Sequence, residues 1–126
     1  MEHYEIEVCG VRRQLPYIPI KKDLAFASFV IISDTELISA CGKELADRIG
    51  AVDALVTAEA KRIALAYEVS RQMGLKEFIV IRKSVKAYMK DVVETTVNSI
   101  TTTEMQRLYL DGVEADKIRG KNICLL

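Results

Sequence analysis

Residues 53–83 read DALVTAEAKRIALAYEVSRQMGLKEFIVIRK, and this stretch decides the fold class of the chain. Its first apolar run, Leu55–Val56, leads through a short polar turn into an amphipathic helix, and a second apolar run follows at Phe78–Ile81. Two apolar runs separated by a helix predict a right-handed βαβ unit, whose parallel strands are buried on both faces. We therefore expect an α/β domain with a mostly parallel sheet and flanking helices.

Both predicted strands end in polar and cationic residues. The first is followed by residues 57–61, which place Lys61 and free backbone N–H groups at a helix N-terminus, and the second is followed by Arg82 and Lys83. Ligands of open parallel sheets bind just beyond the carboxyl ends of the strands. The two strand ends therefore predict a site for an anion such as phosphate or pyrophosphate.

The composition indicates one domain with a cytoplasmic location. The chain has 126 residues, and its 18 Lys and Arg balance 18 Asp and Glu, so no overall field attracts nucleic acid or an anionic membrane. Cys9, Cys41 and Cys124 lie far apart without a CxxC motif, which favours buried thiols over a disulfide framework or a zinc site. The longest apolar stretch, residues 24–32, is too short to span a bilayer.

The N-terminal third is predicted to be extended. Residues 4–8 alternate between apolar and acidic side chains and predict a strand with one solvated face. Residues 12–22 contain two prolines and are therefore extended or loop. Residues 24–32 are apolar and partly β-branched, which fits either a buried strand or part of a flap that covers a ligand.

Two helices are predicted from apolar spacing and end signals. Ser33 followed by Glu36 is a capping-box pattern, and Gly50 suits the end of the helix that follows. Its inward residues are Leu37, Ile38, Cys41, Leu45 and Ile49. The second helix is expected over about residues 60–73 and ends at Gly74. Its inward residues are Ile63, Ala66, Tyr67 and Met73.

The remainder is predicted to alternate loops and strands. The expected elements are an exposed loop over 84–91, an antiparallel pair over 92–102 and 105–110, a turn at Asp111–Gly112, a polar connection over 113–120 and a strand over 122–126. A crossover usually follows such a strand in an α/β domain. We therefore expect the chain to be a fragment of a longer domain, although a short edge strand that completes the fold is the alternative.

Most other kinds of site are disfavoured. Arg82, Lys83, Lys86 and Lys90 either close over a polyanionic substrate or form a solvated surface loop. His3 is the only histidine, which disfavours a mechanism based on a histidine general base. The sequence contains neither GxGxxG nor GxxxxGK[ST], so neither a dinucleotide-binding fold nor a P-loop NTPase is indicated.

The order of these motifs resembles a known family. The chain resembles the type I phosphoribosyltransferases in the order of its motifs, which are a strand, TAEAK opening a helix, FIVIRK, a basic loop, an antiparallel pair and KNICLL. It is most similar to the adenine and xanthine phosphoribosyltransferase-like proteins of the purine branch. The resemblance covers the chain from Arg12 onward and is strongest over residues 53–86. It implies purine salvage, in which phosphoribosyl pyrophosphate and a purine base give a nucleoside monophosphate and pyrophosphate. It also implies a homodimer, and Mg²⁺ chelated by the diphosphate.

The resemblance also assigns residues to the site. Pyrophosphate would contact the loop after the first strand, often through a strained or cis peptide in this family, and that loop consists of Ala58, Glu59, Ala60 and Lys61. Arg82 and Lys83 match the basic pair that opens a flexible loop over residues 84–92, in which Lys86 matches a lysine that reaches the diphosphate. Phe26 would contact the base from a hood segment in residues 1–32, outside the core formed by residues 33–126 of this single, incomplete domain.

Two departures from the family affect the expected activity. Arg62 stands where relatives commonly have glycine, and the acidic pair with a Gly-Gly-Thr loop that holds the ribose 5-phosphate does not occur in these 126 residues. We therefore expect crippled or absent catalysis by this chain alone. The alternatives are a non-enzymatic module of the same fold that senses phosphoribosyl pyrophosphate, and an unrelated doubly wound domain that binds another phosphorylated ligand.

Overall fold

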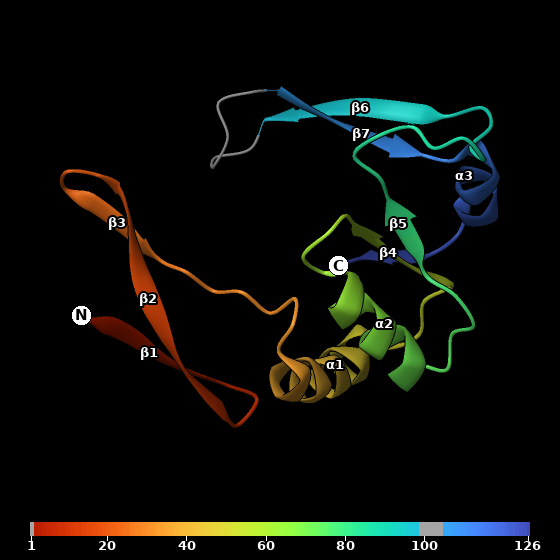
Figure 1. Cartoon of the computed structure of the whole chain (residues 1–126). Helices are drawn as coiled ribbons and strands as arrows, with labels where there is room; N and C mark the ends of the chain where they lie inside the picture. Colours follow the sequence, from red (N-terminus) through yellow and green to blue (C-terminus); the bar gives the residue numbers. More distant parts are fainter. Residues whose placement is uncertain (1, 99–104) are drawn as a thin grey trace.

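The computed structural model describes residues 2–98 and 105–126, and all structural statements below concern these residues. It has mixed α/β content, with a small parallel sheet, a three-stranded antiparallel sheet and a separate antiparallel hairpin (Figure 1). The elements are β1 (His3–Val8), β2 (Val11–Lys21), β3 (Leu24–Ala27), α1 (Thr35–Ile49), β4 (Ala54–Ala58), α2 (Ile63–Gln72), β5 (Ile79–Ile81), β6 (Val93–Asn98), β7 (Met105–Leu110), α3 (Gly112–Ile118) and β8 (Ile123–Leu125). The predicted α/β class is confirmed at this level.

The predicted βαβ unit is confirmed. β4 and β5 are parallel and are connected by α2, with Ala58 opposite Ile81 at their carboxyl ends. β8 pairs with the other side of β4, also in parallel, so the sheet order is β5-β4-β8. The three central residues of β4 (Leu55, Val56 and Thr57) are buried because strands flank β4 on both sides and helices cover it. The predicted strand at residues 122–126 is thus also present.

Helix α1 begins one residue later than the capping pattern predicts. The N-cap is Asp34 and not Ser33, because the Asp34 carboxylate accepts a hydrogen bond from the Leu37 backbone N–H at 3.1 Å. A carboxylate is well suited to this position, where it also meets the positive end of the helix dipole. The end of the helix is as predicted, because Gly50 follows Ile49 with a φ of +70°.

One inward residue of α2 is predicted wrongly. Tyr67 is 59% exposed, because the buried face of this helix is formed by Leu65, Ala66, Val69 and Ser70. At about 100° per residue, these four residues cover an arc of about 140° around the helix, with Ser70 at one edge. Tyr67 lies about 60° beyond that edge, so its aromatic ring is outside the buried face.

The core lies between α1, α2 and the parallel sheet. Leu37 and Cys41 of α1 cluster with Leu55 of β4 and Val69 of α2. Close approach of the helices depends on Gly42, where an added Cβ would lie 2.5 Å from Glu68 Cγ. The two helices thus meet at a position where only glycine avoids a clash with the existing side chain.

The N-terminal third forms an antiparallel sheet with the order β1-β2-β3, which extends away from the central helices (Figure 1). The strand predicted at residues 4–8 is confirmed, and the proline-containing residues 12–22 are extended as expected. In the apolar stretch 24–32, only β3 is a strand, and most of it is exposed. The buried-strand alternative for this stretch is therefore wrong.

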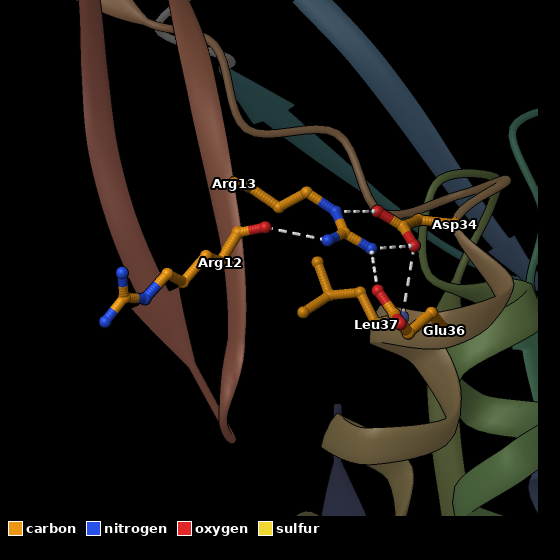
Figure 2. A network of polar contacts seen from close by, with 5 residues as sticks. All are labelled: Arg12, Arg13, Asp34, Glu36 and Leu37. Carbon is orange, nitrogen blue, oxygen red and sulfur yellow. Dashed lines mark hydrogen bonds and ion pairs between the residues drawn. The ribbon is translucent and has the colours of Figure 1, made fainter.

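Arg13 connects this sheet to the start of α1 (Figure 2). Its Nε and Nη2 donate to the two carboxylate oxygens of Asp34 at 2.7 and 2.9 Å, and Nη2 also donates to Glu36 at 2.8 Å. The backbone carbonyl of Arg12, the preceding residue, accepts a hydrogen bond from Arg13 Nη1 at 2.7 Å, but the Arg12 side chain points away from this network (Figure 2). That side chain forms an exposed ion pair with Glu7. One guanidinium group thus joins β2 to the N-cap of the first helix.

The antiparallel pair predicted in the C-terminal half is present as β6 and β7, with Asn98 opposite Met105. Residues 99–102, predicted to belong to the first strand, lie outside the described residues. The turn predicted at Asp111–Gly112 and the polar connection over 113–120 are wrong, because α3 occupies this segment. Asp111 is its N-cap and accepts a hydrogen bond from the Val113 backbone N–H.

The three cysteines are free thiols in different environments. Cys41 is buried, Cys124 is half-buried and Cys9 is exposed, so the expectation of buried thiols holds only in part. Within residues 2–98 and 105–126, no helix is both long enough and apolar enough to cross a membrane.

Candidate functional site

The turn between β4 and α2 consists of Glu59, Ala60, Lys61 and Arg62. The peptide bond between Glu59 and Ala60 is cis, a form that the resemblance associates with this loop. Because α2 begins at Ile63 and not near residue 60, the two cations precede the helix. The first turn of α2, which is described in full, has no acidic residue. Lys61 and Arg62 therefore lie at the positive end of the helix dipole, where two cations are unfavourable without an anion.

Glu59 connects this turn to the end of β5. Its backbone N–H donates to the Ile81 carbonyl at 2.9 Å, which extends the contact between the two parallel strands. Its Oε1 accepts a hydrogen bond from Arg82 Nε, and its Oε2 accepts one from the Lys83 backbone N–H at 3.0 Å. The side chains of Glu59 and Arg82 are only 19% and 30% exposed. One carboxylate thus links both strand ends.

The pairing keeps both groups charged at neutral pH. The pKa of Glu59 is lowered, first by the hydrogen bond from the Lys83 backbone and then by that from Arg82, against a smaller opposing effect of burial. The pKa of Arg82 is raised, chiefly by its hydrogen bond to Glu59. The contact between the two strand ends is therefore an ion pair.

The loop between β5 and β6 has no regular secondary structure, as predicted. Arg82 Nη1 donates to the Tyr88 hydroxyl at 2.9 Å, so the middle of the loop contacts its own beginning. Lys86 Nζ donates to Ser84 Oγ at 2.8 Å, and the positive charge of Lys86 contributes to the lowered pKa of Glu59. The loop thus places a second cation, after Arg82, near the carboxylate.

Both ends of this loop are fixed by backbone contacts. At its start, Arg82 and Tyr109 of β7 exchange two backbone hydrogen bonds of 2.8 Å. At its end, the Lys90 backbone N–H donates to Asp111 at 3.1 Å, and the Gly112 N–H donates to the Lys90 carbonyl at 2.8 Å. A Cβ added at Gly112 would lie 2.5 Å from that carbonyl oxygen, so this close contact requires glycine.

A cavity of about 820 Å³ lies beside the turn. Lys61 and Arg62 line it together with Phe29 and Val30, and α1 forms a further part of its wall. Phe26, the expected base contact, is 42% exposed on β3 and is not among the described residues that line this cavity. Figure 1 shows β3 well separated from the ends of β4 and β5.

The structure therefore brings together most of the residues that the sequence assigned to the anion site. Arg82 and the Lys83 backbone N–H bind the Glu59 carboxylate, and the charge of Lys86 is close enough to help lower its pKa. Lys61 belongs to the same turn as Glu59 but lies on the wall of the cavity. Ala58 and Ala60 contribute only backbone to the turn, and Phe26 does not join the group.

The sequence reasoning missed the neutral partners of Arg82, which are Tyr88 and Tyr109. Tyr88 is an aromatic residue within a basic loop, and that contrast is a signal that could have identified it. The contact of Tyr109 depends on how β7 lies beside β5, and no local pattern around Tyr109 predicts it.

The described residues do not fit a Mg²⁺ ion bound by the protein. Within residues 2–98 and 105–126, no group of three or more His, Cys, Asp or Glu side chains is placed to hold a metal ion. Both carboxylate oxygens of Glu59 already accept hydrogen bonds, from Arg82 and Lys83. We therefore assign no residue of this chain to Mg²⁺.

A scan against protein-family models found no match to the chain, and a search of curated protein sequences found none either. The interpretation of the site thus depends on the residues themselves and on the geometry described above.

Proposed function

We propose that the turn after β4 and the loop after β5 bind the diphosphate group of phosphoribosyl pyrophosphate in a purine phosphoribosyltransferase of type I. The observation that carries this proposal is the double hydrogen bonding of the Glu59 carboxylate by Arg82 and Lys83. This contact joins the turn after β4 to the start of the basic loop after β5, so that cations of both segments lie at one edge of the sheet. Anion recognition at this junction is what the proposed activity requires.

The charge of the site supports the same proposal. The whole chain has no net charge, yet the turn and loop carry six Lys or Arg residues, at positions 61, 62, 82, 83, 86 and 90, against Glu59 and Asp91. A local excess of cations at the carboxyl ends of parallel strands favours a multiply charged anion. Diphosphate carries several negative charges over two adjacent phosphoryl groups, so it can meet cations from both segments at once.

The reaction would use these cations to stabilise the leaving group. The bond between the anomeric carbon of ribose and the diphosphate oxygen breaks, and a bond from that carbon to a nitrogen of the purine forms. Negative charge then develops on the departing pyrophosphate. Cations placed in advance around that charge lower the barrier more than they stabilise the bound substrate, because their interaction strengthens as the charge develops.

Calorimetric titration with magnesium pyrophosphate tests the binding step. We expect Lys61→Ala and Arg82→Ala each to weaken binding by about tenfold, the loss typical of one charge-assisted hydrogen bond. Lys21→Ala is the matched control, because Lys21 is an exposed cation at the end of β2. Unchanged affinity in both site variants would contradict the assignment of the site.

A turnover assay separates an enzyme from a sensor. The natural gene product that contains these residues is incubated with phosphoribosyl pyrophosphate and each common purine base, and nucleotide formation is measured. Nucleotide formation that is lost in Arg82→Ala supports the transferase. Tight binding of phosphoribosyl pyrophosphate without any nucleotide would instead indicate a non-enzymatic sensor with the same fold.

A further inference from the structure

The Arg82 side chain is held from two directions by residues of different segments. Glu59, from the turn after β4, accepts the hydrogen bond of Arg82 Nε. Tyr88, from the middle of the loop, accepts a hydrogen bond from Nη1 at 2.9 Å. The backbone of Arg82 is fixed separately by its two hydrogen bonds with Tyr109. Both the base and the tip of this long side chain thus have defined contacts.

These contacts leave part of the guanidinium group for a ligand. The group has five N–H donors in one plane, and the contacts with Glu59 and Tyr88 use one on Nε and one on Nη1. The second Nη1 hydrogen and the two on Nη2 make no hydrogen bond to the described residues. One Nη2 hydrogen lies on the edge shared with Nε, beside Glu59. The other lies on the end edge shared with Nη1, and the spacing of this end edge matches two oxygens of a phosphoryl group.

We propose that Glu59 and Tyr88 are positioning residues, which orient the Arg82 guanidinium so that this remaining edge receives the diphosphate. This inference rests on the proposed function and deepens it. Neither residue contacts the ligand in this scheme, and both act through Arg82. A flexible arginine side chain loses conformational entropy when it binds a ligand, because only one of its rotamers remains accessible. An arginine that two partners already fix loses less entropy on binding and therefore binds more tightly.

The chemistry of Glu59 suits this task better than that of its amide analogue. One of its oxygens accepts a hydrogen bond from Arg82 Nε, and the other accepts one from the Lys83 backbone N–H. Both ends of the carboxylate must therefore be hydrogen-bond acceptors. A glutamine offers one oxygen and one NH₂ group, and the NH₂ group would face a donor. Glu59→Gln therefore keeps the size of the side chain and removes one of the two contacts together with the charge.

The opposite role for Glu59 makes the opposite prediction. If its carboxylate occupied the place of the ligand, then Glu59→Gln would free the donors and tighten pyrophosphate binding. If Glu59 orients Arg82, the same substitution weakens binding. The sign of the change in affinity thus distinguishes a positioning residue from an internal competitor.

The experiment is a double-mutant cycle on the intact chain, with magnesium pyrophosphate as the probe and calorimetric affinity as the readout. We expect Glu59→Gln to weaken binding by about tenfold and Tyr88→Phe by about threefold, as for loss of a charged and of a neutral hydrogen bond. In an Arg82→Ala background, both substitutions should change affinity by less than about twofold, because a residue that acts through Arg82 has no effect without it.

Tyr4→Phe is the matched control for Tyr88→Phe, since Tyr4 is an exposed tyrosine on β1. Tyr88 is 63% exposed on the loop, so Tyr88→Phe tests the proposal even if Glu59→Gln impairs folding. Tighter binding by Glu59→Gln, or effects that persist without Arg82, would overturn the positioning role. Absence of binding by the wild-type chain would instead overturn the proposed function, and this inference with it.

Discussion

At the scale of single residues, two carboxylates each organise a junction between segments that are distant in sequence. Glu59 joins the ends of β4 and β5, and Asp34 joins β2 to the start of α1. Both accept a hydrogen bond from an arginine and another from a backbone N–H group. A carboxylate can bind both groups because each of its two oxygens accepts hydrogen bonds independently.

The pH dependence of stability reports on Asp34. Hydrogen bonds from Arg13 and then from the Leu37 backbone lower the pKa of Asp34 to about 2. Its pKa in the unfolded chain is about 4, so its contribution to stability is complete above that pH and is lost as the pH falls through 2. Asp34→Asn should lower the Tm at neutral pH by about 3 °C, as expected for a partly exposed ion pair.

The difference in Tm between wild type and Asp34→Asn, measured by circular dichroism, should stay constant from neutral pH down to about 4 and shrink as the pH falls further towards 2. Asparagine is also a good N-cap, so the substitution removes the charge and keeps the cap. Glu44→Gln is the control, because its pair with Arg48 is exposed and should contribute little. A difference that does not change with pH would show that the charge of Asp34 is not responsible.

The sequence identified the cations of the candidate site but not how they are connected. Lys61, Arg82 and Lys83 could be assigned because they directly follow two predicted strands. The pairing of Glu59 with Arg82 requires the register of β4 and β5, in which Ala58 lies opposite Ile81. Glu59 directly follows Ala58 in the chain, and Arg82 directly follows Ile81. Apolar runs specify that two strands are adjacent but not which residues are opposite, so this contact needed the structure.

At the scale of elements, the packing of α1 on α2 depends on Gly42. An added Cβ would lie 2.5 Å from Glu68 Cγ and 3.1 Å from its Cβ, and hydrogen bonds to Arg71 and Gln72 hold the Glu68 side chain. Gly42→Ala should therefore destabilise the protein by about 1–3 kcal/mol through overpacking, partly offset by about 1 kcal/mol of helix propensity. Urea denaturation measures the change.

A second substitution locates the cause of that change. In a Glu68→Ala background, the Cγ at 2.5 Å is removed and only the Cβ at 3.1 Å remains, so Gly42→Ala should become close to neutral. Equal destabilisation in both backgrounds would place the cause in the backbone of α2 and not in the Glu68 side chain.

The elements were predicted best where the apolar pattern is long. The unit from β4 to β5 has two apolar runs and a helix with clear periodicity, so its architecture followed from the sequence. The short helix α3 was missed, because Asp111–Gly112 resembles a turn signal. Glu114 follows Asp111 by three residues, which is also the spacing of a capping box, so the same residues carried both signals. In so short a segment, local propensity does not decide between them.

At the scale of the whole molecule, Arg13 is a main link between the N-terminal sheet and the central helices. It bonds Asp34 through two nitrogens and Glu36 through one of them (Figure 2). Val8 and Val11 add apolar contact with the core. Arg13→Ala should raise amide hydrogen exchange in β1 and β2 by about tenfold, because local opening of this sheet loses a charged contact. Amides in the centre of β4 should change little.

Arg12→Ala is the control for that experiment. Arg12 neighbours Arg13 in β2, but its ion pair with Glu7 is exposed and lies within the sheet itself. Exchange in β1 and β2 should therefore remain close to that of wild type. Equal acceleration by both substitutions would indicate a general loss of strand propensity and not the loss of a link to α1.

The backbone contacts at the two ends of the loop between β5 and β6 have an entropic consequence. Arg82 is paired with Tyr109, and Lys90 is held by Asp111 and Gly112, so the distance between the ends of the loop is already set. Ordering a free segment of this length would cost chain entropy for every residue, at about 1–2 kcal/mol each. Here both ends are fixed and Tyr88 contacts Arg82, so a ligand has to order only the part of the loop around Lys86 and retains more of its interaction free energy as affinity.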